Sequence, residues 1–287
     1  MNFYSNPHAP RRTRLSGAET GLLVGITALT ALALLGPALS AGAHPHSFAD
    51  QRTVWGIPCA LDVLSNVPFA VAGCWGLVVL RRVAAGTLDA MSRALATLFF
   101  VGLLCTALGS TMYHWQPQDT GLLWDRLGMV LPFAGLLGLA AAGRVSMGAG
   151  RAVAAWVLVA GALAVVWWAH TGNLFPWAVV QIGGMLVVLA LACLPRQHGA
   201  LTIHLGAVMV LYALAKLFEA ADHFVFAATL QSVSGHSVKH LLAAGAAAPV
   251  VVALHALRYN CLNGSPCKAA AGQNGVGAGG VVRRPCV

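Results

Sequence analysis

The chain has 287 residues, of which 58% are hydrophobic and only 9% are charged, and its formal net charge is +9. This composition excludes an ordinary soluble globular protein, in which charged residues make up about a quarter of the chain. The positive charge does not predict nucleic-acid binding, because the basic residues lie mostly between apolar segments rather than on one face. We therefore expect the membrane, and no nucleic acid, as a partner.

The N-terminal part of the chain, residues 1–43, is predicted to be a separate unit. Residues 1–19 are polar and basic, an apolar segment runs from about 20 to 40, and Ala41-Gly42-Ala43 follows. This order is typical of a secretory signal peptide cleaved after Ala43. The apolar segment is long for a signal peptide, so an uncleaved signal-anchor helix fits the pattern equally well.

Seven further apolar segments predict a polytopic membrane protein. Each is close to the roughly 20 residues that a helix needs to cross a bilayer. None shows the alternation of a barrel strand, and backbone groups in lipid must be paired within the segment, so all are expected to be helices. The segments are 60–80, 94–114, 121–142, 152–170, 174–194, 201–229 and 237–257.

The predicted fold class is therefore all-α. A seven-transmembrane-helix bundle over residues 44–260 follows the N-terminal signal peptide or extra helix. Residues 261–287 are rich in Gly and Ala and are predicted to form a disordered cytoplasmic tail.

The basic residues predict the orientation of the bundle. If the chain crosses the membrane at each segment, only Arg52 lies in a loop on the side opposite the N-terminus. An excess of Lys and Arg marks the cytoplasmic side, so the N-terminus and the tail are expected there. The basic residues on that side are Arg11, Arg12, Arg14, Arg81, Arg82, Arg93, Arg144, Arg151, Arg196, Arg258, Lys268, Arg283 and Arg284.

Two distant stretches are expected to form a site near the outer face. Ser110 and His114 are one helical turn apart, and so are His236 and His240. The alternation of the segments places both stretches at the outer ends of their helices. It also places Asp125 one turn into the next helix from that side, so all five residues lie at a similar depth.

Three imidazoles with a nearby carboxylate and hydroxyl predict a catalytic zinc site. Zinc binds imidazole nitrogen well, and three protein ligands with an open fourth position are typical of catalysis. We expect His114, His236 and His240 to bind Zn²⁺, and Asp125 to accept a proton from a zinc-bound water. Ser110 is expected to donate a hydrogen bond to the developing oxyanion.

Other polar residues lie toward the same side of the membrane. Lys216 and Glu219 are three residues apart on one helix and are expected either to neutralise each other or to orient the zinc histidines. Asp222 and His223 follow on the same segment. Asp62, Ser65 and Asn66 are expected to cap or cross-link helices rather than to take part in chemistry.

Over roughly residues 50 to 258 the sequence resembles the alkaline ceramidase family, within the CREST superfamily of seven-helix membrane hydrolases. The bacterial ceramidase-like branch is the most similar, which implies a bacterial inner membrane. The resemblance implies zinc bound by His114, His236 and His240, catalytic roles for Ser110 and Asp125, and hydrolysis of the N-acyl amide of a ceramide-like lipid. The motifs that carry it are Gly56-Ile-Pro, Ser65-Asn-x-Pro-Phe69, Ser110-x-x-x-His114, Leu123-Trp-Asp125-Arg126, Lys216-x-x-Glu219-x-x-Asp222 and Ser234-Gly-His236-x-x-x-His240.

One departure from the family concerns calcium. Animal members of the family have an acidic, Trp-containing N-terminal segment that binds Ca²⁺. In this chain the region reads His44-Pro-His-Ser-Phe-Ala-Asp50, and Cys59 stands where an acidic ligand is expected. The sequence therefore argues against a Ca²⁺ site.

Three functions compete at this point. The first is a zinc amidase acting on a membrane lipid, and the second is a receptor-like or other lipid-hydrolase relative in the superfamily with a structural zinc. The third is an intramembrane protease, but neither G-x-S-G nor H-E-x-x-H occurs in the chain. Ser110 and Asp125 favour the amidase, because a structural zinc site needs neither.

Overall fold

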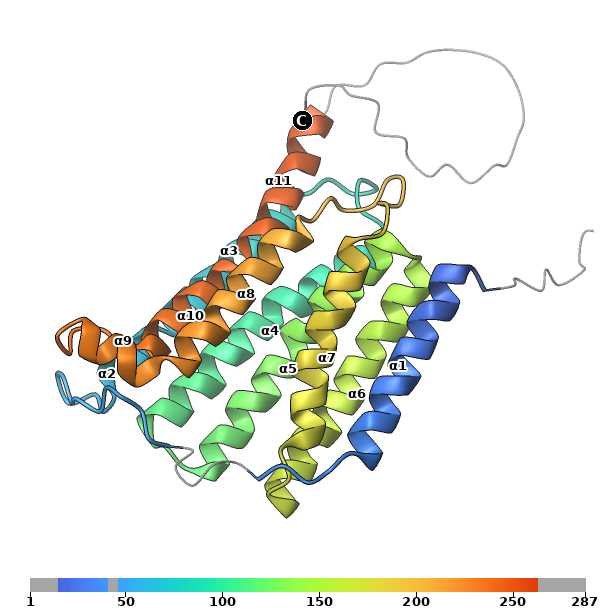
Figure 1. Ribbon diagram of the computed structural model, residues 1–287. Coiled ribbons are helices and arrows are strands. Elements are labelled where there is room, and N and C mark those ends of the chain that lie inside the picture. Colours follow the sequence, from blue (N-terminus) through green and yellow to red (C-terminus); the bar gives the residue numbers. More distant parts are fainter. Residues whose placement is uncertain (1–14, 41–45, 263–287) are drawn as a thin grey trace, which may run out of the picture.

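The structure is a computed structural model that describes residues 15–40 and 46–262, with side chains described as far as Tyr259. Figure 1 shows a bundle of long helices, and within the described ranges no β-strand forms. The predicted all-α bundle is therefore confirmed. The predictions for Arg11, Arg12 and Arg14, for cleavage after Ala43 and for most of the 261–287 tail concern positions outside the described residues. The tail prediction is wrong for residues 261 and 262, which belong to the last helix.

The helices follow one another in an up-and-down arrangement. In chain order they are α1 (Gly17–Leu35), α2 (Ala60–Leu64), α3 (Val67–Arg81), α4 (Ala90–Trp115), α5 (Asp119–Arg144), α6 (Met147–Thr171), α7 (Phe175–Ala192), α8 (Leu205–Ala220), α9 (Asp222–Ala228), α10 (Gly235–Gly245) and α11 (Ala248–Leu262).

Seven of the helical stretches are long and apolar enough to cross a membrane. They are Gly17–Leu35, Ala60–Arg81, Ala90–Trp115, Asp119–Arg144, Met147–Thr171, Phe175–Ala192 and Gly235–Tyr259. The set includes the N-terminal helix α1. It does not include α8, which has 16 residues and is shorter than the predicted 201–229 segment. This composition indicates a membrane protein.

Three of the predicted segments are each divided into two helices. Pro68 and Pro249 stand at the second position of α3 and α11, where a missing N–H is tolerated but the preceding helix cannot continue unbroken. The break at Ala221 has no proline. It lies where Gly235 approaches the backbone so closely that an added Cβ would be 2.3 Å from the Phe218 carbonyl oxygen.

The pairing of α4 with α5 positions part of the site. At Gly109 an added Cβ would lie 2.5 Å from the carbonyl oxygen of Trp124, so only glycine permits this approach. The two backbones are in contact one residue before Ser110 and one before Asp125. This contact brings the two side chains to the same interior space.

Helix α1 lies at the edge of the bundle beside α6 and α7 (Figure 1). Ser146 Oγ donates to Glu19 Oε1 at 2.7 Å, and Trp156 Nε1 donates to Thr30 Oγ1 at 2.9 Å. These contacts join α1 to α6 along most of its length. Whether α1 is cleaved as a signal peptide or retained as a helix stays a prediction.

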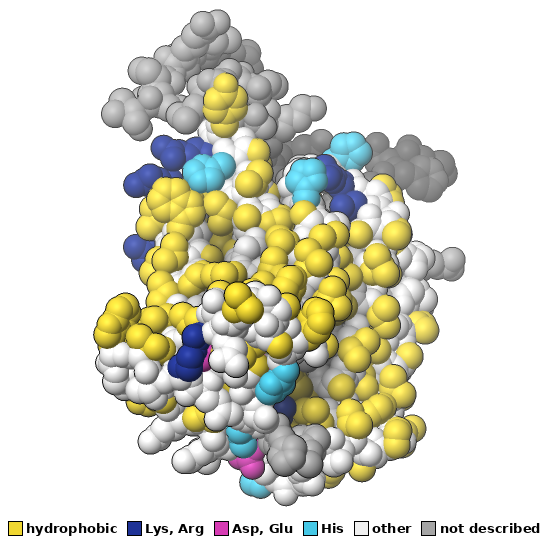
Figure 2. Space-filling model, turned by 60° about the vertical axis from the view of Figure 1, so that its left-hand side comes forward, with side chains coloured by type: hydrophobic (Ala, Val, Ile, Leu, Met, Phe, Trp, Pro, Cys, Tyr) yellow, Lys and Arg dark blue, Asp and Glu magenta, His cyan; other side chains and the backbone are white. Residues whose placement is uncertain are grey.

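The surface has a broad apolar belt, and Figure 2 shows Lys and Arg side chains gathered mainly at one end of it. The start of α1 and the end of α11 both lie at one end of the bundle (Figure 1). The connections that contain α2 and α9 lie at the opposite end. Which of these ends faces the cytoplasm stays a prediction.

Candidate metal centre

The three predicted histidines meet inside the bundle. His114 comes from the last turn of α4, and His236 and His240 come from α10; all three are buried, with exposed fractions of 1%, 9% and 3%. One ring nitrogen from each lies within 4.8 Å of the other two. The Nε2 atoms of His114 and His236 are 3.2 Å apart. Two nitrogens bound to one tetrahedral zinc would be about 3.3 Å apart, so this spacing suits a shared metal ion.

The start of α10 is held so that its histidines face α4. Ser234 caps the helix by accepting a hydrogen bond from Ser237 N at 2.9 Å, and Asp222 Oδ1 accepts from His236 N at 2.8 Å. His236 and His240 lie one turn apart and point to the same side. The cap therefore sets the rotation of α10, and with it the position of two metal ligands.

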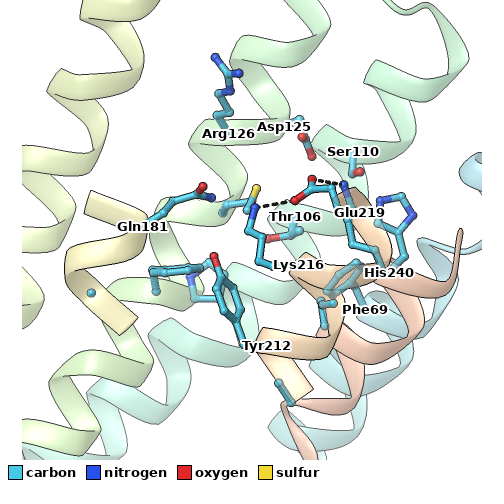
Figure 3. Close-up of a pocket in the computed structure, with 18 of the residues that line it drawn as sticks. Phe69, Thr106, Ser110, Asp125, Arg126, Gln181, Tyr212, Lys216, Glu219 and His240 are labelled. Atoms are coloured by element: carbon cyan, nitrogen blue, oxygen red, sulfur yellow. Dashed lines mark hydrogen bonds and ion pairs between the residues drawn. The ribbon is translucent and has the colours of Figure 1, made fainter. Parts of the chain in front are cut away.

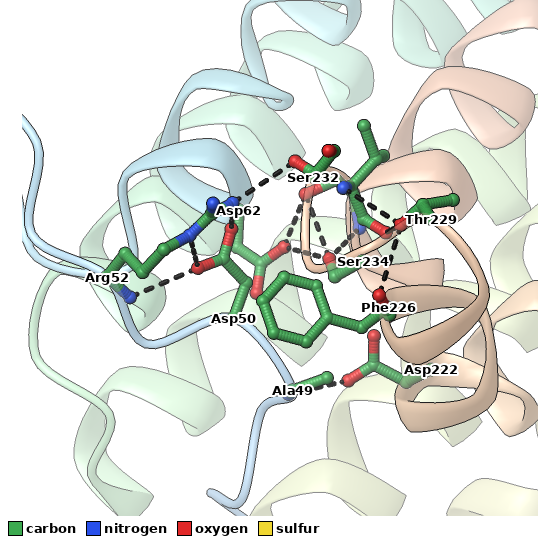
Figure 4. A network of polar contacts seen from close by, with 11 residues as sticks. Ala49, Asp50, Arg52, Asp62, Asp222, Phe226, Thr229, Ser232 and Ser234 are labelled. Carbon is green, nitrogen blue, oxygen red and sulfur yellow. Dashed lines mark hydrogen bonds and ion pairs between the residues drawn. The ribbon is translucent and has the colours of Figure 1, made fainter.

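A buried carboxylate supports this cap from another helix. Asp62 Oδ1 accepts hydrogen bonds from Ser234 Oγ at 2.9 Å and Ser237 Oγ at 2.6 Å (Figure 4). Asp62 belongs to α2, so these bonds link α2 to α10 beside the histidines. The expected role of Asp62 in cross-linking helices agrees with this placement.

Ser110 and Asp125 line a cavity of about 470 Å³ that also exposes His236 and His240. Both side chains project into the same part of the cavity (Figure 3). The rest of the cavity wall is mostly apolar and aromatic. Its deeper residues include Phe99, Leu103, Phe133, Leu137, Val188 and Val208. The histidine cluster therefore lies at the polar end of an apolar cavity.

The predicted pair of Lys216 and Glu219 forms and gains a third member. Lys216 Nζ lies 2.7 Å from Glu219 Oε2, and Lys239 Nζ of α10 lies 2.9 Å from Glu219 Oε1. All three residues line the cavity beside the histidines. Sequence reasoning missed Lys239, although a lysine within an apolar segment is itself a signal, because such charges usually face a partner or a cavity.

The segment before α2 covers the outer side of the histidines. The Phe48 ring centroid lies 4.6 Å from that of His114 and 4.9 Å from that of His236. Ala49 N donates to Asp222 Oδ2 at 2.9 Å, so one carboxylate holds both this segment and α10 (Figure 4). Phe48 is itself buried and packs against two of the three histidines. No sequence pattern pointed to it.

The same segment contains an ion pair between buried Asp50 and exposed Arg52. Arg52 Nε and Nη2 each donate to Asp50 at 2.7 Å, and Arg52 Nη2 also donates to the Ser232 carbonyl at 3.1 Å. Burial raises the pKa of Asp50, but the hydrogen bonds and charge of Arg52 outweigh it, and the pKa of this carboxyl is below its ordinary value. The Asp50 carboxylate of this segment is thus bound by the Arg52 guanidinium. The absence of a Ca²⁺ site stays a prediction.

All five predicted site residues therefore converge on one place: Ser110, His114, Asp125, His236 and His240. Three buried histidines that could hold a metal ion are shown, while the identity of the metal and the roles of Ser110 and Asp125 stay predictions. The relation to the ceramidase family rests on the sequence motifs. Comparison of the chain with protein-family models, with curated proteins and with solved structures gives no match.

Proposed function

We propose that the protein is a zinc-dependent membrane amidohydrolase that cleaves the N-acyl amide bond of a ceramide-like lipid. One observation carries the proposal. A buried set of three imidazoles lies at the polar end of an otherwise apolar cavity, next to a serine and a carboxylate. Such a cavity suits an amphiphile whose polar linkage lies at the histidines and whose chain lies among the apolar side chains.

The donor set fits zinc. Three neutral imidazoles are good ligands for Zn²⁺, and within the described part of the chain the cluster contains no fourth His, Cys, Asp or Glu ligand. A three-ligand set leaves the open position that catalytic zinc sites keep. When bound, zinc would polarise a carbonyl group and lower the pKa of a coordinated water to about 7.

Asp125 and Ser110 have the positions that the reaction needs. Asp125 lines the cavity on α5, opposite the α10 histidines, and its carboxylate is a suitable acceptor for a proton of the attacking water. Ser110 lines the same cavity as Asp125. By rotating about its Cα–Cβ bond, Ser110 can donate to the oxygen of the scissile carbonyl as negative charge develops there.

The cavity supports a lipid substrate. Its volume of about 470 Å³ lies within the 300–1,000 Å³ range of small-molecule pockets, and its deeper wall carries no charged residue. Phe48 covers the histidines from the outer side. An acyl chain along the apolar wall would bring its amide group to the histidines.

The experiment is metal analysis and lipid hydrolysis with the same purified protein. We expect about one zinc per chain and release of fatty acid from an N-acyl lipid, with both lost in His114→Ala, His236→Ala and His240→Ala. His255→Ala is the matched control, because His255 is exposed and contacts Trp75 away from the cluster. It should keep both zinc and activity.

Other results would identify a different function. Full zinc retention in any two of the three histidine variants would remove the metal assignment. Cleavage of an ester lipid but of no amide would indicate a lipase-like relative. Zinc binding with no hydrolysis of either, and a ligand response that survives Asp125→Asn, would indicate a receptor with a structural zinc.

A further inference from the structure

The cavity carries an excess of positive charge. Its described lining includes three cationic side chains and two carboxylates: Arg126, Lys216 and Lys239 against Asp125 and Glu219. Each carboxylate oxygen of Glu219 is bound by one ammonium, at 2.7 Å and 2.9 Å. Lys216 and Lys239 therefore share one counter-charge. An uncompensated charge inside a membrane bundle is costly, and such residues normally face a polar partner or a bound ion.

The same region offers unused hydrogen-bond donors. An ammonium has three N–H groups, and Lys216 and Lys239 each direct one at Glu219. The Tyr212 hydroxyl, which also lines the cavity, is buried and has no hydrogen-bond partner among the described residues. Figure 3 shows Tyr212 and Gln181 directed toward the space beside Lys216. This wall therefore suits a ligand rich in acceptors.

We propose that Lys216, with Lys239 and Tyr212, binds an acidic group on the amine half of the substrate. Among the N-acyl lipids that the proposed reaction covers, the preferred substrates would then be those whose amine part carries a carboxylate or a similar acid, such as N-acyl amino acids. Ceramide, whose head group is neutral, would be cleaved less efficiently. This inference rests on the proposed amide hydrolysis and defines which half of the substrate is recognised by charge.

The chemistry of such a substrate matches the layout of the cavity. In an N-acyl amino acid the carboxylate is separated from the amide nitrogen by a single carbon. With the amide at the histidines, the carboxylate would lie next to the metal site, where Lys239 and Lys216 are found. The acyl chain would occupy the apolar end. A charge-assisted hydrogen bond in this low-dielectric space is about twice as strong as a neutral one.

The reaction remains a simple hydrolysis. The oxygen of water bonds to the acyl carbon, the C–N bond breaks, and one proton of the water moves to the leaving nitrogen by way of Asp125. The products are a fatty acid and a free amino acid. No oxidant, reductant or further substrate is needed.

The test compares N-palmitoylglycine with N-palmitoylglycinamide, which lacks the negative charge but has the same size. N-palmitoyltaurine is added as a second acid and ceramide as a second neutral amide. We expect kcat/KM for the two acids to exceed that for the neutral amide by about tenfold or more. Lys216→Met should remove most of this preference through KM, Lys216→Arg should keep it, and Tyr212→Phe should reduce it. Arg258→Met, at the other end of the bundle from the site, is the control and should change nothing.

Two further results separate the inference from the proposed function. If acids and neutral amides are cleaved equally well, or if Lys216→Met lowers both rates by the same factor, the acidic-group site is wrong and the amidase stands. If no substrate is cleaved, thermal stabilisation of the protein by N-palmitoylglycine and by N-palmitoylglycinamide decides the question. The acidic-group site is supported if N-palmitoylglycine raises the Tm of the wild type more than N-palmitoylglycinamide does, and if this difference disappears in Lys216→Met. It is refuted if the two compounds stabilise the wild type equally.

Discussion

Ser65 Oγ lies 2.7 Å from His240 Nδ1 and donates its only proton to the Asp62 carbonyl, 3.0 Å away. With that proton on the carbonyl, the hydroxyl oxygen is an acceptor for Nδ1–H of His240. We infer the Nδ1-protonated tautomer, in which the lone pair of Nε2 is free for a metal. A hydroxyl in the turn between α2 and α3 thus orients a histidine on α10.

Removing this hydroxyl should weaken zinc binding without abolishing it. We expect Ser65→Ala to lower zinc affinity by about 10–100-fold, because His240 loses the partner that fixes its tautomer and ring orientation. Ser65→Thr, which keeps a hydroxyl, should retain most of the affinity. Competition with a chelator of known affinity measures the effect. Ser92→Ala, near the opposite end of α4, is the control, and equal losses in both alanine variants would argue against the role of Ser65.

Asp125 and Ser110 should affect the rate rather than the metal. Asp125→Asn keeps the shape of the side chain but cannot accept a proton, so we expect normal zinc content and loss of most of the hydrolytic rate. Ser110→Ala should lower kcat by about 10²–10³-fold, as for removal of a single oxyanion donor. Zinc analysis and kinetics on the same samples check both. Zinc loss in Asp125→Asn would make Asp125 a structural residue of the metal site.

The connection between α4 and α5 tests the orientation. Its residues 116–118 lie at the end of the bundle that contains the site, away from the basic end. The positive-inside rule then predicts that a reporter fused after residue 117 is non-cytoplasmic and that one fused after Arg144 is cytoplasmic. A cytoplasmic signal from the first fusion would invert the orientation and place the site on the inner side.

The Asp50–Arg52 pair should make stability depend on acidity. The pKa of Asp50 is lowered in the folded protein from its ordinary value of 3.8, because the bonds from Arg52 outweigh the effect of burial. Its stabilising contribution is therefore present above pH of about 4 and is lost as pH falls through the folded pKa. Asp50→Asn should lower the Tm near neutral pH. Its Tm should then decrease less than that of the wild type as the pH is lowered.

The matched control for this measurement is Asp89→Asn, because asparagine also caps a helix well and Asp89 is an exposed cap of α4. Its Tm should follow the wild-type curve. If Asp50→Asn and the wild type lose stability in parallel as the pH falls, the ion pair contributes nothing measurable to the fold.

The amino-acid sequence was enough to predict the helices and to name the residues that meet at the histidine cluster. Runs of about 20 apolar residues can only be helical in lipid, and helix periodicity places His236 and His240 on one face. Alternation of the segments then placed His114 and Asp125 at the same depth. These inferences depend only on helix periodicity and on the number of membrane crossings that precede each residue. They therefore required no knowledge of tertiary contacts. For the same reason the breaks at Ser65–Asn66 and Ala221 were missed, since a continuous apolar run hides them.

Contacts between side chains on different helices could be read only from the three-dimensional arrangement. Ser65 and His240 are 175 residues apart, Lys239 meets Glu219 from another helix, and Phe48 reaches the histidines from a segment without regular structure. Such contacts depend on how each helix is rotated and how closely it approaches its neighbour. The close backbone contacts at Gly109 and Gly235 determine this packing. A one-residue rotation turns a side chain by about 100° on a helix, and spacing along the chain carries no information about that angle.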